Sequence, residues 1–348
     1  QFLKDGGHYE RSPMYHSIAL EDLLDVCNLL ERSNSQEEKK FLKGLKSVAN
    51  QAIEFLVSIV GADKKIPLFN DSAYGVAIEP FDLFSYAERV LGYQESDRLK
   101  SGFDLIELPY SGYFGYKNNA DSFLIDCGDI APDYQPGHGH CDTLSYVLCL
   151  DGKPLIIDSG ISGYDEDDYR SYFRGTSAHN TVSVNDQEQS EIWGTFRVAR
   201  RARAQLHHFR KTENGILKFS GSHSGYKRLS PSIEHHRDVI IDTQGCWEFY
   251  DVIEGRGYSS ALSFIHFHPS ISLSKNTSRF WDLSREGQKF GRLIIADELE
   301  ATEKKQPFSP EFGVNLTHSV LIIPVSGTMP LKIHYVIEKV RRNEDAQS

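Results

Sequence analysis

The clearest signal of fold in the chain is the stretch Leu144-Ser145-Tyr146-Val147-Leu148-Cys149-Leu150-Asp151-Gly152-Lys153-Pro154-Leu155-Ile156-Ile157-Asp158. Two β-favouring runs flank an Asp-Gly pair, which is the strongest short-range signal of a hairpin. A two-residue turn at this pair would join Leu150 to Lys153 and therefore set Ser145 opposite Asp158. The stretch thus predicts antiparallel β-structure in the middle of the chain.

The same texture extends over the rest of the chain from about Ser101 onward. Short apolar runs there alternate with turns rich in Gly, Asn, Asp and Ser, a pattern typical of stacked antiparallel sheets. Further strands are predicted at residues 122–127, 181–184, 216–220, 239–242, 247–252, 263–267, 292–296, 320–324 and 332–337.

The segment before Ser101 has helical periodicity instead. Ser12 and Pro13 suit the cap and the first position of a helix that runs to about Arg32. Two more helices are predicted at about residues 36–60 and 81–91. Three helices enclose little core, so we interpret them as the tail of a larger helical domain. The predicted architecture is a multidomain α+β chain, with helices in residues 1–98 and β-sandwich-like sheets in residues 99–348.

Composition excludes several classes of function. A formal net charge of -11 argues against nucleic-acid binding, which needs a basic surface. No apolar run approaches the roughly 20 residues of a membrane helix. Nucleotide-binding loops and the serine-hydrolase elbow have no match in the sequence. The five cysteines lack close pairing and predict no disulfide framework. Because the chain begins with Gln1, we interpret it as processed or truncated, which leaves compartment and oligomeric state open.

A cluster of histidines and carboxylates is the main candidate for chemistry. His138, His140 and Asp142 alternate, so an extended chain would point all three to one side. Asp158 ends the hairpin and His179 precedes a later strand. Imidazoles with a carboxylate suit a zinc-like ion. The hairpin pairing sets His140 five residues beyond Ser145, so a metal site requires a bend or a bulge. The alternative is that each histidine has only a structural, hydrogen-bonded role.

Two other groups allow more than one interpretation. Tyr15 lies in the first turn of the first helix, where the helix dipole favours a phenolate, but the alternative is an ordinary helix start. Basic residues cluster at 197–203, 207–211 and 235–237, and Arg170 and Arg174 stand just before His179. They either line a groove for a polyanionic sugar or balance surface carboxylates.

The ordered set of motifs resembles the heparinase II/III-like polysaccharide lyases. The motifs are Ser12-Pro13-Met14-Tyr15-His16, Gly137-His138-Gly139-His140-Cys141-Asp142, Ile157-Asp158-Ser159-Gly160 and Arg174-Gly175-Thr176-Ser177-Ala178-His179-Asn180-Thr181. The resemblance implies the C-terminal part of an (α/α) toroid in residues 1–98 and stacked antiparallel sheets in residues 99–348, with the active site in the cleft between them. It also implies a bacterial protein, either periplasmic or cytoplasmic.

The resemblance also assigns roles to particular residues. Tyr15 matches the catalytic tyrosine, and His138 matches the active-site histidine of the β-domain. His140, Asp158 and His179 match the ligands of a structural zinc ion. We add two expected substrate contacts: His8, from the segment Asp5-Gly6-Gly7-His8 just before the first motif, and Arg174. The family's Asn or His that neutralises the substrate carboxylate would lie some fifty residues upstream of Tyr15, before Gln1.

The implied reaction is β-elimination on an acidic polysaccharide that contains uronic acid. Neutralisation of the carboxylate makes the C5 proton removable, a base takes it, and an acid protonates the leaving oxygen. Two alternatives remain at this stage: a non-catalytic polysaccharide-binding or surface-polysaccharide biosynthesis protein that retains the lyase fold, and a metal-dependent hydrolase.

Overall fold

A computed structural model gives the structure of residues 1–93 and 103–340, and the expected domain boundary at residues 98 and 99 lies outside these ranges. The three predicted helices are confirmed as α1 (Pro13–Leu30), α2 (Gln36–Ile59) and α3 (Pro80–Leu91). Ser12 caps α1, its side chain accepting a hydrogen bond from the Tyr15 N–H. None of the helices in these ranges is long and apolar enough to cross a membrane.

The β-structure of the described residues forms three larger sheets and one two-stranded sheet, all with antiparallel pairing. The first sheet has the order β1-β2-β3-β4-β5 and consists of β1 (Phe103–Leu108), β2 (Tyr113–Asn118), β3 (Ser122–Asp126), β4 (Tyr146–Leu150) and β5 (Lys153–Ile156). The eight-stranded sheet has the order β14-β15-β16-β19-β12-β11-β10-β9 and consists of β9 (Ala204–Lys211), β10 (Leu217–His223), β11 (Glu234–Ile241), β12 (Cys246–Glu254), β14 (Ile271–Lys275), β15 (Phe280–Arg285), β16 (Gln288–Ile295) and β19 (Leu331–Lys339).

The remaining strands form a four-stranded and a two-stranded sheet. The four-stranded sheet has the order β17-β18-β13-β6 and consists of β6 (Val182–Val184), β13 (Tyr258–His266), β17 (Thr302–Phe308) and β18 (Leu316–Thr328). The two-stranded sheet pairs β7 (Ile192–Trp193) with β8 (Arg197–Val198), and the short helix α4 spans Asp168–Arg174.

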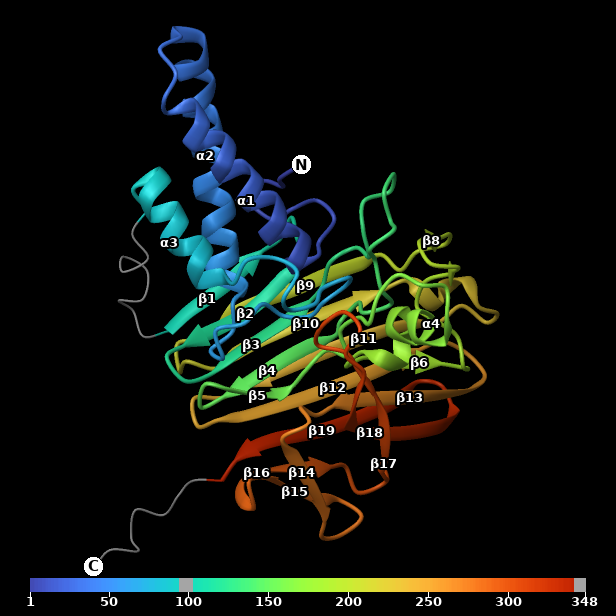
Figure 1. Cartoon of the computed structure of the whole chain (residues 1–348). Coiled ribbons are helices and arrows are strands. Elements are labelled where there is room, and N and C mark those ends of the chain that lie inside the picture. Colours follow the sequence, from blue (N-terminus) through green and yellow to red (C-terminus); the bar gives the residue numbers. More distant parts are fainter. Residues whose placement is uncertain (94–102, 341–348) are drawn as a thin grey trace, which may run out of the picture.

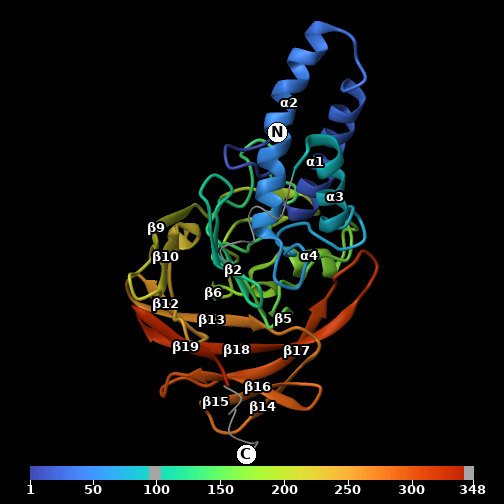
Figure 2. The same ribbon diagram turned by 90° about the vertical axis from the view of Figure 1, so that its left-hand side faces the viewer.

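The first sheet lies between the helices and the eight-stranded sheet. One core contains Phe123 and Leu148 of the first sheet together with Phe249 and Tyr335 of the eight-stranded sheet. A second core joins the helices to the outer side of β1–β3. Figure 1 shows the helices above β1–β5, and the view of Figure 2 places them at the opposite end of the molecule from β14–β16. The helices thus cover one end of a stack of sheets.

The hairpin forms where the sequence predicts it, but its pairing contains an irregularity. Leu150 pairs with Lys153 as expected, whereas a bulge between Leu148 and Cys149 sets Leu148 opposite Ile156. A bulge adds a residue to one strand and bends it, so the expected pairing of Ser145 with Asp158 is wrong. Each of the other predicted strands overlaps an observed strand, while β1, β2, β7, β8, β9, β14, β15 and β17 went unpredicted.

The helical part is smaller than a toroid. The described residues contain three long helices and α4, and these do not make a ring. The fold of this chain is therefore a group of helices followed by stacked antiparallel sheets.

Candidate active site

Two loops meet beneath the helices and build the site. One connects α2 to α3 and carries Asn70 and Asp71; the other, residues 137–142, precedes β4. The Asn70 side chain accepts a hydrogen bond from the His140 N–H at 2.9 Å, and the Asp71 N–H donates to the His138 carbonyl at 3.1 Å. The Asn70 N–H donates to Asp142 at 3.2 Å. The alternating side chains of His138, His140 and Asp142 therefore all face this loop.

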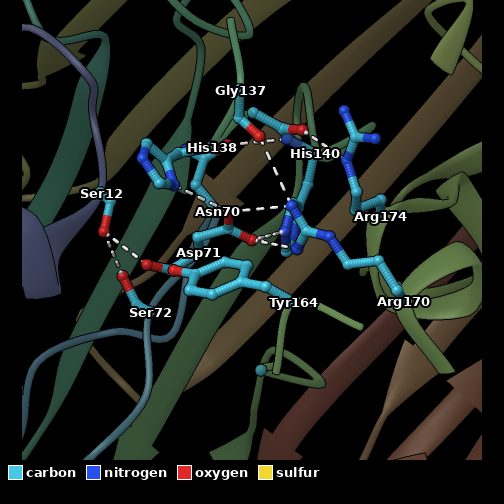
Figure 3. Close-up of polar contacts among 12 residues, drawn as sticks. Ser12, Asn70, Asp71, Ser72, Gly137, His138, His140, Tyr164, Arg170 and Arg174 are labelled. Carbon is cyan, nitrogen blue, oxygen red and sulfur yellow. Dashed lines mark hydrogen bonds and ion pairs between the residues drawn. The ribbon is translucent and has the colours of Figure 1, made fainter. Parts of the chain in front are cut away.

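Asp71 is the centre of the site (Figure 3). Its fully buried carboxylate lies 2.9 Å from His138 Nδ1 and 2.7 Å from His140 Nε2, and it pairs with the Arg170 guanidinium through both oxygens. Burial raises the pKa of Asp71, but the hydrogen bonds from the two histidines and Arg170 outweigh it and hold the pKa well below its ordinary value. Asp71 is therefore a permanent anion that accepts from all three partners.

The bond to Asp71 determines which nitrogen of His138 is free. An ionised carboxylate only accepts, so Nδ1 carries a hydrogen, and in the neutral ring Nε2 is the nitrogen that has the lone pair. The Nε2 atom lies 3.7 Å from Glu10 Oε2, and the side chain retains 16% of its exposure. His138 is thus arranged as a base whose conjugate acid has a carboxylate within reach.

Tyr15 supplies the complementary group. Its ring centroid lies 4.2 Å from that of His138, and its hydroxyl is 2.8 Å from the Tyr164 hydroxyl. Burial, together with the negative charges of Asp71 and Glu10, raises the pKa of Tyr15, although the Tyr164 hydrogen bond and Arg170 oppose the shift. The phenol is therefore protonated at neutral pH in the free protein. A proton acceptor and a proton donor stand side by side.

His8 and Arg174, the two residues expected to contact substrate, have different surroundings. Burial lowers the pKa of His8 to about 4, with smaller effects from the N-terminal charge and His138. A neutral His8 near His138 offers a hydrogen bond and no positive charge, and its substrate contact stays a prediction. Arg174 is only 1% exposed, and its guanidinium donates to the main-chain carbonyls of Gly139, Gly194 and Arg197. In the free protein the Arg174 guanidinium is therefore committed to main-chain carbonyls, and its substrate contact stays a prediction.

The expected metal ligands lie close together without forming a coordination shell. The His140 and His179 ring centroids are 5.4 Å apart, and His179 Nδ1 lies 2.8 Å from Asp158 Oδ2. His140 Nδ1 and His179 Nε2 are buried without a hydrogen-bond partner. Within residues 1–93 and 103–340, no group of three His, Cys, Asp or Glu side chains is arranged to hold a metal ion. The donor types suit zinc, but the arrangement does not bring three donors to one point.

The other arginines mainly balance carboxylates. Arg200 pairs with Glu191, both Arg201 and Arg203 pair with Asp133, and Arg203 also reaches Asp129. The buried Arg237 pairs with Asp251. These pairs favour the interpretation that the arginines balance carboxylates over the interpretation that they line a free basic groove.

Sequence reasoning missed several members of the site. Asp71, Asn70 and Tyr164 were not singled out, and Arg170 was noted only as one of several arginines. A usable signal was present: Asn70 and Asp71 directly follow the apolar run Ile66-Pro67-Leu68-Phe69, which indicates that they lie close to the core. Buried polar groups in such a place need partners.

Comparisons with known proteins show to which family and fold the chain is similar. Residues 100–341 match the model for the C-terminal region of heparinase II/III-like proteins, and residues 1–88 match that for the heparinase II/III N-terminus. A heparin-sulfate lyase of Pedobacter heparinus is 23% identical over 376 residues, covering 100% of this chain and 50% of that protein. One of Bacteroides thetaiotaomicron is 24% identical over 226 residues, covering 56% of this chain and 32% of that protein.

The crystal structure of heparan sulfate lyase HepC from Pedobacter heparinus has a TM-score of 0.80 to this chain at 17% identity, covering 99% of this chain and 54% of that one. At this identity the likeness concerns the fold. The chain spans half or less of the length of the curated relatives named above.

Proposed function

Because the chain belongs to the heparinase II/III-like family, we propose that it carries out β-elimination on an acidic polysaccharide that contains uronic acid. The observation that supports this most directly is the pair of His138 and Tyr15, in contact at 4.2 Å between ring centroids. β-Elimination removes the C5 proton and delivers a proton to the leaving oxygen. His138 and Tyr15 together offer an acceptor and a donor for these two transfers.

In the proposed reaction His138 Nε2 takes the proton from C5 of the uronic acid. The electron pair of that C–H bond forms the C4–C5 double bond, and the bond from C4 to the glycosidic oxygen breaks. Tyr15 donates its phenolic proton to the departing oxygen. Asp71 keeps the Nδ1–H of His138 in place and, with Glu10 at 3.7 Å, stabilises the imidazolium.

The uronate carboxylate must be neutralised for the C5 proton to become acidic. Arg170 is committed to Asp71, and Arg174 donates to main-chain carbonyls. The resemblance assigns this task to an Asn or His upstream of Tyr15, and we keep that assignment as part of the proposal.

The test of this function is the ultraviolet absorbance of the new C4–C5 double bond when the protein is mixed with heparan sulfate or a polyuronide. We expect Tyr15→Phe and His138→Gln to abolish the signal while thermal unfolding stays close to that of the parent. Full activity in Tyr15→Phe would refute the assignment. A saturated product would show hydrolysis, and binding without any product would show a non-catalytic protein.

We also propose a structural zinc ion held by His140, Asp158 and His179, whose side chains would have to converge on the ion when it binds. The support is the pair of buried ring nitrogens without partners, His140 Nδ1 and His179 Nε2. When bound, the ion would crosslink the loops and take no part in proton transfer. We expect elemental analysis of the purified protein to find about one zinc per chain, and chelation to lower the melting temperature. A protein purified without zinc would contradict this.

The three long helices are also part of the proposal. We propose that α1–α3 are the end of an (α/α) toroid completed by further helices. Val26, Leu29 and Phe41 on α1 and α2 are 42%, 71% and 61% exposed, and apolar residues of this kind are suited to packing against other helices.

A further inference from the structure

Three loops from distant parts of the chain each bring an aromatic residue to one place. Tyr164 follows β5, Phe196 lies between β7 and β8, and Phe312 lies between β17 and β18. The Tyr164 ring centroid is 5.5 Å from that of Phe196 and 5.4 Å from that of Phe312. Phe196 is 46% exposed and Phe312 is 37% exposed. This group, which we call the aromatic platform, is therefore open to solvent.

The aromatic platform adjoins the reacting pair. The His138 ring centroid lies 6.1 Å from that of Tyr164 and 6.3 Å from that of Phe196. The Tyr164 hydroxyl is also the partner of the Tyr15 hydroxyl. A sugar ring whose C5 proton reaches His138 would therefore lie close to Tyr164 and Phe196, and Phe312, which contacts the Tyr164 ring, extends this surface by one more ring.

The rings are held in place by the same network that orients His138. The Arg170 guanidinium packs over the Tyr164 ring at 5.2 Å and over the Phe196 ring at 5.5 Å. Its charge is balanced by Asp71, and it is nearly fully buried. Rings fixed in this way lose little conformational freedom when a ligand binds, which favours affinity.

The chemistry of a pyranose explains what such a surface binds. The axial C–H groups of a sugar ring form an apolar face with slightly positive hydrogens, and an aromatic ring presents a negative face. We propose that the aromatic platform binds, by stacking, the sugar ring next to the reacting uronic acid. This inference rests on the proposed function and gives the site a contact that needs no free cation. A contact of this kind is consistent with the state of the two nearby arginines, because Arg170 is already paired with Asp71 and Arg174 with main-chain carbonyls.

Leucine variants test the proposal because they keep apolar volume and remove the aromatic face. The probe is a heparan sulfate hexasaccharide, used for KM and kcat and, in a Tyr15→Phe background, for Kd by calorimetry without turnover. We expect Phe196→Leu and Phe312→Leu each to raise KM and Kd roughly five- to tenfold. The kcat value should stay within about twofold, since stacking acts equally on the ground state and the transition state.

Two further variants separate stacking from general damage. Phe196→Tyr keeps an aromatic face and should bind nearly as the parent does. Tyr258→Leu removes an aromatic that is 73% exposed at the start of β13, the end opposite His266, and should leave both constants unchanged.

The outcomes distinguish this inference from the function on which it rests. If the parent cleaves the hexasaccharide and the two leucine variants bind as tightly as it does, the aromatic platform is refuted and the lyase stands. If the parent binds without cleavage and the leucine variants weaken binding, the aromatic platform stands and the lyase falls. A parent that binds neither the heparan sulfate hexasaccharide nor a polyuronide oligosaccharide refutes both.

Discussion

Replacement of Asp71 by asparagine tests the central arrangement of the site. The amide has the shape of the carboxylate but no charge, so the buried Arg170 loses its counter-ion. Arg170 is 1% exposed, and removal of one partner of a buried pair costs roughly 3–5 kcal/mol. We therefore expect Asp71→Asn to fold with a clearly lower free energy of unfolding.

The expected loss of activity in Asp71→Asn arises from a change in the tautomer of His138 and is separate from the loss of stability. When an amide NH₂ group faces His138 Nδ1, the ring must accept there and carry its hydrogen on Nε2, which then cannot take a proton. A lost general base lowers the rate by on the order of 10²–10⁴. Nitrogen NMR of the imidazole should report the change of tautomer, and the ultraviolet assay should report the rate at a temperature where the variant is folded.

Asp251→Asn is the matched control. Asp251 is also buried and also pairs with an arginine and a histidine, Arg237 and His235. We expect a similar loss of stability from this change, with the tautomer of His138 unaltered. The reasoning fails if Asp71→Asn retains the parental rate, or if Asp251→Asn shifts the His138 tautomer equally.

Further predictions concern stability. Burial lowers the pKa of His16 to about 3, below its ordinary 6.5. Between these two pH values the unfolded chain therefore binds more protons than the folded protein does. The free energy of unfolding must then fall as the pH drops from 6.5 toward 3. One proton accounts for roughly 2 kcal/mol between about pH 6.5 and 5; urea unfolding of His16→Gln should show a shallower dependence, and equal slopes would contradict the assignment. Gly44→Ala in α2 meets no atom within 4 Å and should stabilise by about 0.5–1 kcal/mol. Gly115→Ala in β2 would place a Cβ 1.9 Å from the Phe123 carbonyl oxygen and should destabilise the fold by roughly 1–3 kcal/mol. Thermal unfolding of the two glycine variants beside the parent tests both predictions.

The sequence by itself determined most of the elements of secondary structure, because their signals are local. The Ser12-Pro13 start of α1 and the Asp151-Gly152 turn act within a few residues. The strands missed at the edges, such as β14 and β9, are more polar and more exposed, and therefore lack a clear apolar run. The alternation of His138, His140 and Asp142 likewise indicated correctly that they share one side.

Only the tertiary structure decided what that side faces. The partner of His138 is Asp71, 67 residues away, and the arginine that completes the ion pair is 99 residues from Asp71. Backbone periodicity sets the direction of a side chain, but the group opposite it depends on how distant loops pack. The same limit applies to Arg174. Its motif suggests an arginine that contacts substrate, whereas packing directs its guanidinium toward main-chain carbonyls.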